Sequence, residues 1–154
     1  MNMIEAIKVC IQKYATFSGR ARRSEFWWFF LFSFVLGLIP VVSVISGLVL
    51  LIPGLAVGWR RMHDIGRPGY HYLMPLAVIL LVGLAFAALA SLGLAPTGGS
   101  DPSPVFIALF AIAALAVLGA LIVQIVWLAS SSQRGPNQFG PEPGAEVRVE
   151  GVFD

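Results

Sequence analysis

The chain alternates between long uncharged apolar runs and short segments that hold nearly all of its charged side chains. No Asp, Glu, Lys or Arg lies between Phe26 and Trp59, and between Pro68 and Gln133 the only one is Asp101. Uncharged apolar runs longer than about 18 residues are typical of membrane-spanning helices, because a helix satisfies its own backbone hydrogen bonds where lipid offers no partners. The pattern therefore predicts an all-α membrane protein.

The first apolar run, residues 26–59, is too long for one ordinary span. As a single helix its 34 residues would measure roughly 51 Å. Crossing a hydrocarbon core of about 30 Å would then need a tilt near ~54°, outside the usual range of about 0–40°. Two short spans, about 26–41 and 45–61, fit better if a tight turn joins them. The residues suited to that turn are Gly37, Pro40, Ser43, Ser46 and Gly47.

The distribution of basic residues also favours the hairpin. Of the ten Lys and Arg residues, five precede the first span, three lie between the second and third spans, and two follow the fourth. A hairpin places all ten on one side of the membrane, whereas a single long span divides them. Because short loops rich in Lys and Arg belong to the cytoplasm, the sequence predicts four spans with both termini cytoplasmic.

The remainder of the chain predicts two longer spans and a tail. The spans cover about 73–94 and 105–128, and the loop between them is rich in Pro, Gly and Ser and contains no Lys or Arg. We expect residues 1–143 to form a single membrane domain. Residues 144–154 are acidic and short of apolar side chains, so we expect a disordered tail.

The first residues of the chain predict an amphipathic helix over residues 2–16. Apolar side chains recur there at helical spacing, and charged side chains occupy other positions. The apolar positions are Ile4, Ile7, Ile11 and Tyr14. Two placements remain open: the helix lies in the headgroup plane as an interfacial helix, or it packs on the rest of the protein.

Composition supports the membrane assignment and narrows the chemistry. Hydrophobic residues make up 58% of the chain, charged residues 12%, and the mean hydropathy is +0.85, whereas globular proteins hold about 25% charged residues. The first apolar run starts at Phe26 and lacks a small-residue cleavage site, so no signal peptide is expected. With one cysteine, Cys10, no intramolecular disulfide forms. No metal and no cofactor are expected.

Three polar segments at the ends of the predicted spans carry ordered motifs. They read Gly19-Arg20-x-x-Arg23-x-Glu25-Phe26-Trp27, then Arg60-Arg61-x-His63-Asp64 followed by Gly69 and Tyr70, and finally Gly135-x-Asn137-x-Phe139-Gly140-Pro141-x-Pro143. In these motifs the chain resembles the bacterial membrane proteins grouped as domain of unknown function 805. The resemblance implies a bacterial inner-membrane protein and brings no settled activity.

The predicted cytoplasmic face holds six arginines against two carboxylates, Glu25 and Asp64. The arginines are Arg20, Arg22, Arg23, Arg60, Arg61 and Arg67. Arg22 and Glu25 are three residues apart, and Arg60 and Asp64 are four apart, so each pair can meet on a helix. One interpretation is therefore a set of structural ion pairs that fix the open end of the hairpin.

The excess of positive charge supports a second interpretation, a binding site for anionic lipid or another phosphate-bearing ligand. Each basic residue near an anionic surface contributes on the order of 1 kcal/mol, and arginine binds phosphate oxygens with two parallel hydrogen bonds. The candidate binding residues are Arg20, Arg23, Arg60, Arg61, Arg67 and Asn137. Nucleic acid is not expected, because the neighbouring aromatic residues are explained by the membrane interface.

Our leading hypothesis is a non-enzymatic scaffold that binds a partner protein or anionic lipid through this face. The alternative is a membrane enzyme acting on a phosphate-bearing lipid headgroup, with His63 and Glu25 as the acid–base pair and Asp64 as a second carboxylate. A small transporter fits less well, because ionisable residues mark most transport pathways and the predicted spans contain none. The oligomeric state is not predicted.

Overall fold

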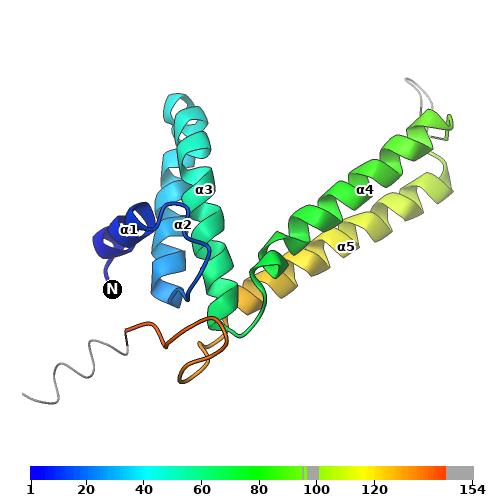
Figure 1. Ribbon diagram of the computed structural model, residues 1–154. Helices are drawn as coiled ribbons and strands as arrows, with labels where there is room; N and C mark the ends of the chain where they lie inside the picture. The colour runs from blue at the N-terminus through cyan, green and yellow to red at the C-terminus, as the bar shows by residue number, and fades with distance from the viewer. Residues whose placement is uncertain (95, 97–100, 145–154) are drawn as a thin grey trace, which may run out of the picture. The chain divides into compact units, whose positions relative to one another are not determined.

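A computed structural model describes residues 1–94, 96 and 101–144 of the chain. Over these residues the protein is helical and contains no strand, which confirms the predicted all-α class (Figure 1). The helices are α1 (Met3–Gln12), α2 (Arg23–Gly37), α3 (Pro40–Asp64), the short 3-10 helix η1 (Gly69–Leu73), α4 (Met74–Ser91) and α5 (Pro104–Ala129). The predicted disordered tail lies, from residue 145 onward, outside the described residues.

Three segments of the described chain are long and apolar enough to cross a membrane. They are Pro40–Asp64, Gly69–Ser91 and Pro104–Ala129. The remaining predicted span corresponds to α2, which has 15 residues and therefore measures only about 22 Å. Length and composition thus support three of the four predicted spans.

The predicted division of residues 26–59 into two helices is confirmed, but the turn lies earlier than expected. Helix α2 ends at Gly37 and α3 begins at Pro40, and the two helices pack against each other (Figure 1). Proline suits the first helical position because its ring presets φ and it has no N–H to satisfy. The residues 42–44 that separate the two predicted spans therefore belong to the start of α3, where the Ser43 hydroxyl donates to the carbonyl of Pro40 at 2.8 Å.

Helix α1 starts with a capping box and packs on α2. The Asn2 side chain accepts a hydrogen bond from the backbone N–H of Glu5 at 2.8 Å, and the Glu5 carboxylate accepts one from the backbone N–H of Asn2 at 3.1 Å. Ala6 and Cys10 are fully buried on the side that faces α2. The structure thus favours the packed placement of this helix, while its apolar residue Ile4 stays 62% exposed.

The described residues form two compact units. One contains Met1–Tyr72 together with the chain from Trp127 onward, and the other contains Leu73–Val126. In the first unit the core consists of Cys10, Ala21, Phe26, Phe29, Val57, Met62 and Leu128. In the second unit α4 and α5 lie side by side (Figure 1), and the ring of Phe86 contacts those of Phe106 and Phe110 edge-on. The single membrane domain over residues 1–143 stays a prediction.

Gly58 of α3 permits a close approach that the first unit depends on. The ring of Tyr72 lies against this glycine, and a Cβ at position 58 would collide with the ring. We expect Gly58→Ala to destabilise the protein by roughly 1–3 kcal/mol through overpacking, seen as a lower unfolding temperature of purified protein in detergent. Gly47→Ala is the matched control, because its Cβ in the same helix would meet nothing within 4 Å. Equal unfolding temperatures for the two variants would contradict the prediction.

Candidate functional site

The three motif segments meet at the end of the α2–α3 hairpin that lies away from the Gly37–Pro40 turn. Five charged side chains from two of these segments are buried there, with residue exposures between 0 and 6%. We call this group the arginine clasp; it consists of Arg20, Glu25, Arg60, Arg61 and Asp64. The third segment follows α5, and we call its residues 130–143 the strap.

Asp64 is the centre of the clasp. Its Oδ1 accepts a hydrogen bond from Arg20 Nε at 3.0 Å, and its Oδ2 accepts one from Arg61 Nη1 at 2.5 Å. The hydroxyl of Ser132 in the strap also donates to Oδ2, and the backbone N–H of Gln133 donates to the Asp64 carbonyl at 2.9 Å. One buried carboxylate therefore joins the chain before α2, the end of α3 and the strap.

The second ion pair of the clasp joins α2 to α3. Arg60 Nη1 donates to Glu25 Oε1 at 2.6 Å, and the Cys10 thiol lies 3.9 Å from the same oxygen. The partners differ from those that helical spacing predicted, because Glu25 contacts Arg60 instead of Arg22. Arg22 is the N-cap of α2 and has an extended backbone, so the three-residue helical spacing does not apply to it.

Arg20 and Arg61 also bind backbone carbonyls at and beyond the end of α5. Arg61 Nε donates to the Leu128 carbonyl at 3.1 Å, and Arg61 Nη2 donates to that of Ser130. Arg20 donates to the carbonyls of Gln133 at 2.5 Å and Gly135 at 2.6 Å. The last carbonyls of a helix lack intrahelical partners and favour cations nearby. The Arg61 guanidinium therefore caps α5, and both guanidinium groups hold the strap in place.

The strap is also fixed through His63 and Asn137. The Asn137 side chain donates to the backbone carbonyl of His63 at 2.9 Å, and the ring of Phe139 stacks on that of His63 with centroids 4.0 Å apart. His63 Nδ1 lies 3.0 Å from the Gly19 carbonyl. Because a carbonyl only accepts, Nδ1 carries the hydrogen in this contact.

The acid–base candidates are therefore each engaged with other groups. His63 is bound to Gly19, Glu25 is bound to Arg60, and Asp64 holds two arginines. Among the described residues no hydrogen bond joins His63 to either carboxylate. The geometry consequently supports positioning of the chain by these groups more directly than proton transfer between them.

The predicted binding residues fall into two classes. Arg20, Arg60 and Arg61 are buried, and Asn137 is half-buried and hydrogen-bonded, whereas Arg23 and Arg67 are exposed. Two further arginines outside the predicted binding set, Arg22 and Arg134, are also exposed. No charge pattern in the sequence separates the two classes, because both occur inside the same short motifs.

The exposed arginines, Arg22, Arg23, Arg67 and Arg134, keep charge available at the surface. No ion pair within the described residues involves any of the four; Arg22 donates to the Pro143 carbonyl, and Arg67 lies over the ring of Trp127 at 4.2 Å. A polar cleft of about 390 Å³ opens beside two of these arginines. It is lined by Arg22, Arg23, Ser24, Ser132, Glu142 and Pro143.

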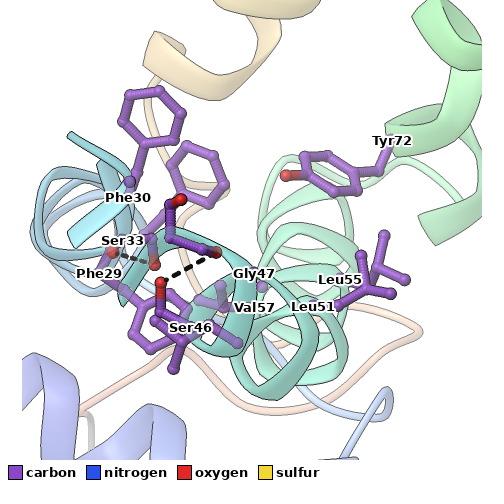
Figure 2. Close-up of a pocket in the computed structure, with 14 residues that line it drawn as sticks. Phe29, Phe30, Ser33, Ser46, Gly47, Leu51, Leu55, Val57 and Tyr72 are labelled. Atoms are coloured by element: carbon purple, nitrogen blue, oxygen red, sulfur yellow. Dashed lines mark hydrogen bonds between the residues drawn. The ribbon is translucent and has the colours of Figure 1, made fainter. Parts of the chain in front are cut away.

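A second hollow, of about 280 Å³, lies along the α2–α3 hairpin and is apolar (Figure 2). Figure 2 shows phenylalanine and leucine side chains around it, with Tyr72 at its edge. The hydroxyls of Ser33 and Ser46 donate to their own helices, to the carbonyls of Phe29 at 2.9 Å and Ser43 at 3.3 Å. These hydroxyls are therefore satisfied, and the hollow suits hydrocarbon better than a polar ligand.

Long apolar helices and a buried polar clasp at one end of a helical hairpin define a helical membrane protein. The chain belongs to the family described as "Protein of unknown function (DUF805)", whose model matches residues 14–141. The inner membrane protein YhaH of Escherichia coli (strain K12) is 35% identical over 80 residues, covering 42% of this chain and 66% of that protein. The inner membrane protein YhaI of the same strain is 39% identical over 71 residues, covering 38% and 60%.

The family match and the names of these relatives thus confirm the predicted family and the predicted class of inner-membrane protein. The chain spans less than two thirds of the length of these relatives. No solved structure matches the chain.

Burial should make the Cys10 thiol unreactive. Desolvation raises its pKa to about 12, and the neighbouring Glu25 charge adds to the effect. Because the thiolate is the nucleophile, we expect alkylation by iodoacetamide at pH 8 to be at least roughly a thousandfold slower than that of an ordinary cysteine with a pKa near 8.5. The rate should rise with pH up to the raised pKa, and protein denatured in SDS should react normally. Fast alkylation of the folded protein would contradict the prediction.

Removing the Asp64 charge should leave two buried cations without their partner. We expect Asp64→Asn to cost on the order of 3–5 kcal/mol, the usual effect of breaking a buried ion pair, measured as the thermal unfolding midpoint in detergent. Ser132→Ala removes one donor to Asp64 and should cost about 1 kcal/mol, so it remains measurable if Asp64→Asn does not fold. Arg134→Gln, at an exposed site, is the control, and a midpoint for Asp64→Asn equal to that of this control would exclude the central role of Asp64.

Proposed function

We propose that this protein is a non-enzymatic membrane scaffold whose exposed arginines bind the anionic headgroups of the membrane around it. The observation that carries the proposal is the division of the arginines by burial. Arg20, Arg60 and Arg61 are buried and bond to carboxylates, whereas Arg22, Arg23, Arg67 and Arg134 are exposed and have no carboxylate partner among the described residues. Arg22 and Arg23 donate to the backbone carbonyls of Pro143 and Ala129.

The chemistry of the exposed arginines suits phosphate. A guanidinium presents two parallel N–H groups to phosphate oxygens and keeps its charge at every physiological pH. The cleft beside Arg22 and Arg23 also contains the side chains of Ser24 and Ser132, whose hydroxyls are of the type that bonds to phosphate. The carboxylate of Glu142 lines the same cleft, so the local charge balance is two cations to one anion.

The same proposal includes an orientation in the bacterial inner membrane. We place both termini and the basic residues at the cytoplasmic surface, where Lys- and Arg-rich segments are retained and anionic lipids attract them. Four complete crossings satisfy this orientation, and so do two crossings with a re-entrant hairpin, because both α2 and α3 have their charged ends at the clasp. A partner protein with an acidic surface would compete for the same four arginines.

The test replaces the four exposed arginines together by glutamine. Each basic residue near an anionic surface contributes about 1 kcal/mol, and about 1.4 kcal/mol is a factor of ten. We therefore expect co-purified anionic phospholipid, measured by native mass spectrometry, to fall at least roughly tenfold. The matched control carries lysine at the same four positions, which keeps the charge, and it should retain most of the lipid.

Both variants should unfold at nearly the temperature of the unmodified protein, because the substituted side chains are exposed and the surface hydrogen bonds from Arg22 to Pro143 and from Arg23 to Ala129 contribute little to stability. Unchanged lipid content in a correctly folded glutamine variant would contradict the proposal. Loss of lipid in the lysine control as well would indicate that bidentate contacts, in addition to charge, hold the headgroups.

A further inference from the structure

We propose that the acidic segment after the strap, residues 145–154, binds in the polar cleft beside Arg22 and Arg23 and competes there with anionic headgroups. The interaction surface is the cleft described above, and its partner is a segment of the same chain. Binding of the segment stands on its own, whereas the competition rests on the proposed headgroup binding. Separate measurements therefore test the two parts.

The strap brings the chain directly to Arg22. The carbonyl of Pro143 accepts hydrogen bonds from Arg22 Nε at 3.0 Å and from Arg22 Nη2 at 2.8 Å. Gly144 lies against the same guanidinium, and a Cβ at this position would collide with Nη2. Gly144 also has a φ of 81°, which glycine adopts without strain. The segment that follows therefore starts in contact with one arginine of the cleft.

The segment and the cleft have opposite charge. Residues 145–154 read AEVRVEGVFD and hold three carboxylates against one cation; these are Glu146, Glu150, Asp154 and Arg148. The cleft holds two cations against one carboxylate, Glu142. The sequence predicts no fold for the segment, and a chain without a fold of its own can follow a charged surface. Opposite charge therefore favours this segment as the occupant of the cleft.

The first carboxylate of the segment is within reach of the cleft. Glu146 follows Gly144 by two residues, so their Cα atoms lie at most about 7 Å apart. Because Gly144 touches the Arg22 guanidinium, the Glu146 carboxylate can reach that group. Glu150 lies at most about 21 Å from Gly144 along the chain. A tether this short gives an effective concentration of about millimolar or more, so even a weak contact forms often.

Both arginines of the cleft have donors left for a carboxylate. Arg22 bonds to Pro143 through Nε and Nη2, and Arg23 bonds to Ala129 through Nη1 at 3.3 Å. Among the described residues, neither Arg22 Nη1 nor Arg23 Nη2 has an acceptor. The carboxylate that already lines the cleft, Glu142, accepts instead from the backbone N–H of Gly135 at 3.0 Å. A carboxylate from the segment therefore finds free N–H groups of the kind it binds best.

The segment and a headgroup would use the same donors. Carboxylate and phosphate oxygens both accept parallel N–H groups from a guanidinium, so one group excludes the other from the same arginine. The segment is tethered beside the cleft, whereas headgroups are available only where the membrane contains anionic lipid. We therefore expect the segment to occupy the cleft in a neutral environment and to be displaced by a surface rich in anionic lipid.

Cleavage by trypsin after Arg148 reports whether the segment is bound. Full-length protein in dodecyl maltoside, an uncharged detergent without phosphate, receives limiting trypsin, and the initial loss of residues 149–154 is followed by intact mass. In Arg22→Gln/Arg23→Gln we expect this rate to rise roughly three- to fivefold, because weak exposed ion pairs hold the segment. Arg67→Gln/Arg134→Gln is the matched control. It removes two exposed arginines outside the cleft and should leave the rate unchanged.

Gly144→Ala tests the same contact without a change of charge. Its Cβ would collide with Arg22 Nη2, and its φ of 81° is unfavourable for alanine, so the segment should be directed away from the cleft and cleaved faster. Cleavage at the unmodified rate in both the double glutamine variant and Gly144→Ala would overturn the proposal. An equal rise in the control pair would overturn it as well, because the effect would then be one of net charge.

The competition is measured by adding phosphatidylglycerol to the micelles. The cleavage rate of the unmodified protein should rise toward that of Arg22→Gln/Arg23→Gln in the same micelles, a comparison that corrects for any effect of the lipid on trypsin. Phosphatidylcholine should have no effect. Phosphatidylglycerol bound in native mass spectra without faster cleavage would overturn the competition. Protection in neutral detergent without any bound phosphatidylglycerol would contradict the proposed headgroup binding and support binding of the segment.

Discussion

Asp64 ends α3 with both carboxylate oxygens occupied, one by Arg20 from the chain before α2 and the other by Arg61 and by Ser132 from the strap. Burying a carboxylate with two guanidinium groups is costly unless every partner is present, and removing one partner leaves an uncompensated charge. Each of the three segments therefore requires the other two. The Glu25–Arg60 pair extends the same dependence to the first turn of α2. This mutual requirement explains why three motifs far apart in the sequence belong to one structural unit.

The clasp also determines which arginines can contact a ligand. Arg20 and Arg61 direct their N–H groups to Asp64 and to backbone carbonyls of α5 and the strap. A phosphate group could reach them only after those bonds had broken. Arg22 and Arg67 lie on the surface at the edge of the same region, where a headgroup would compete only with the Arg22 hydrogen bonds to the Pro143 carbonyl and the Arg67 contact with the Trp127 ring. In the proposed function, ligand binding is therefore a property of the residues around the clasp and not of its centre.

The sequence by itself determined the helical class, the apolar segments, the break in the first run and the family, because absence of charge over long runs and ordered motifs are local properties. It did not determine the position of the turn, which Pro40 sets at the first residue of α3, or the ion-pair partners. Helical spacing paired Arg22 with Glu25 and Arg60 with Asp64, whereas the structure pairs Arg60 with Glu25. Only the tertiary structure decided which arginines are buried and that α1 packs on α2 through Ala6 and Cys10, because burial and pairing depend on segments that are distant in sequence and adjacent in space.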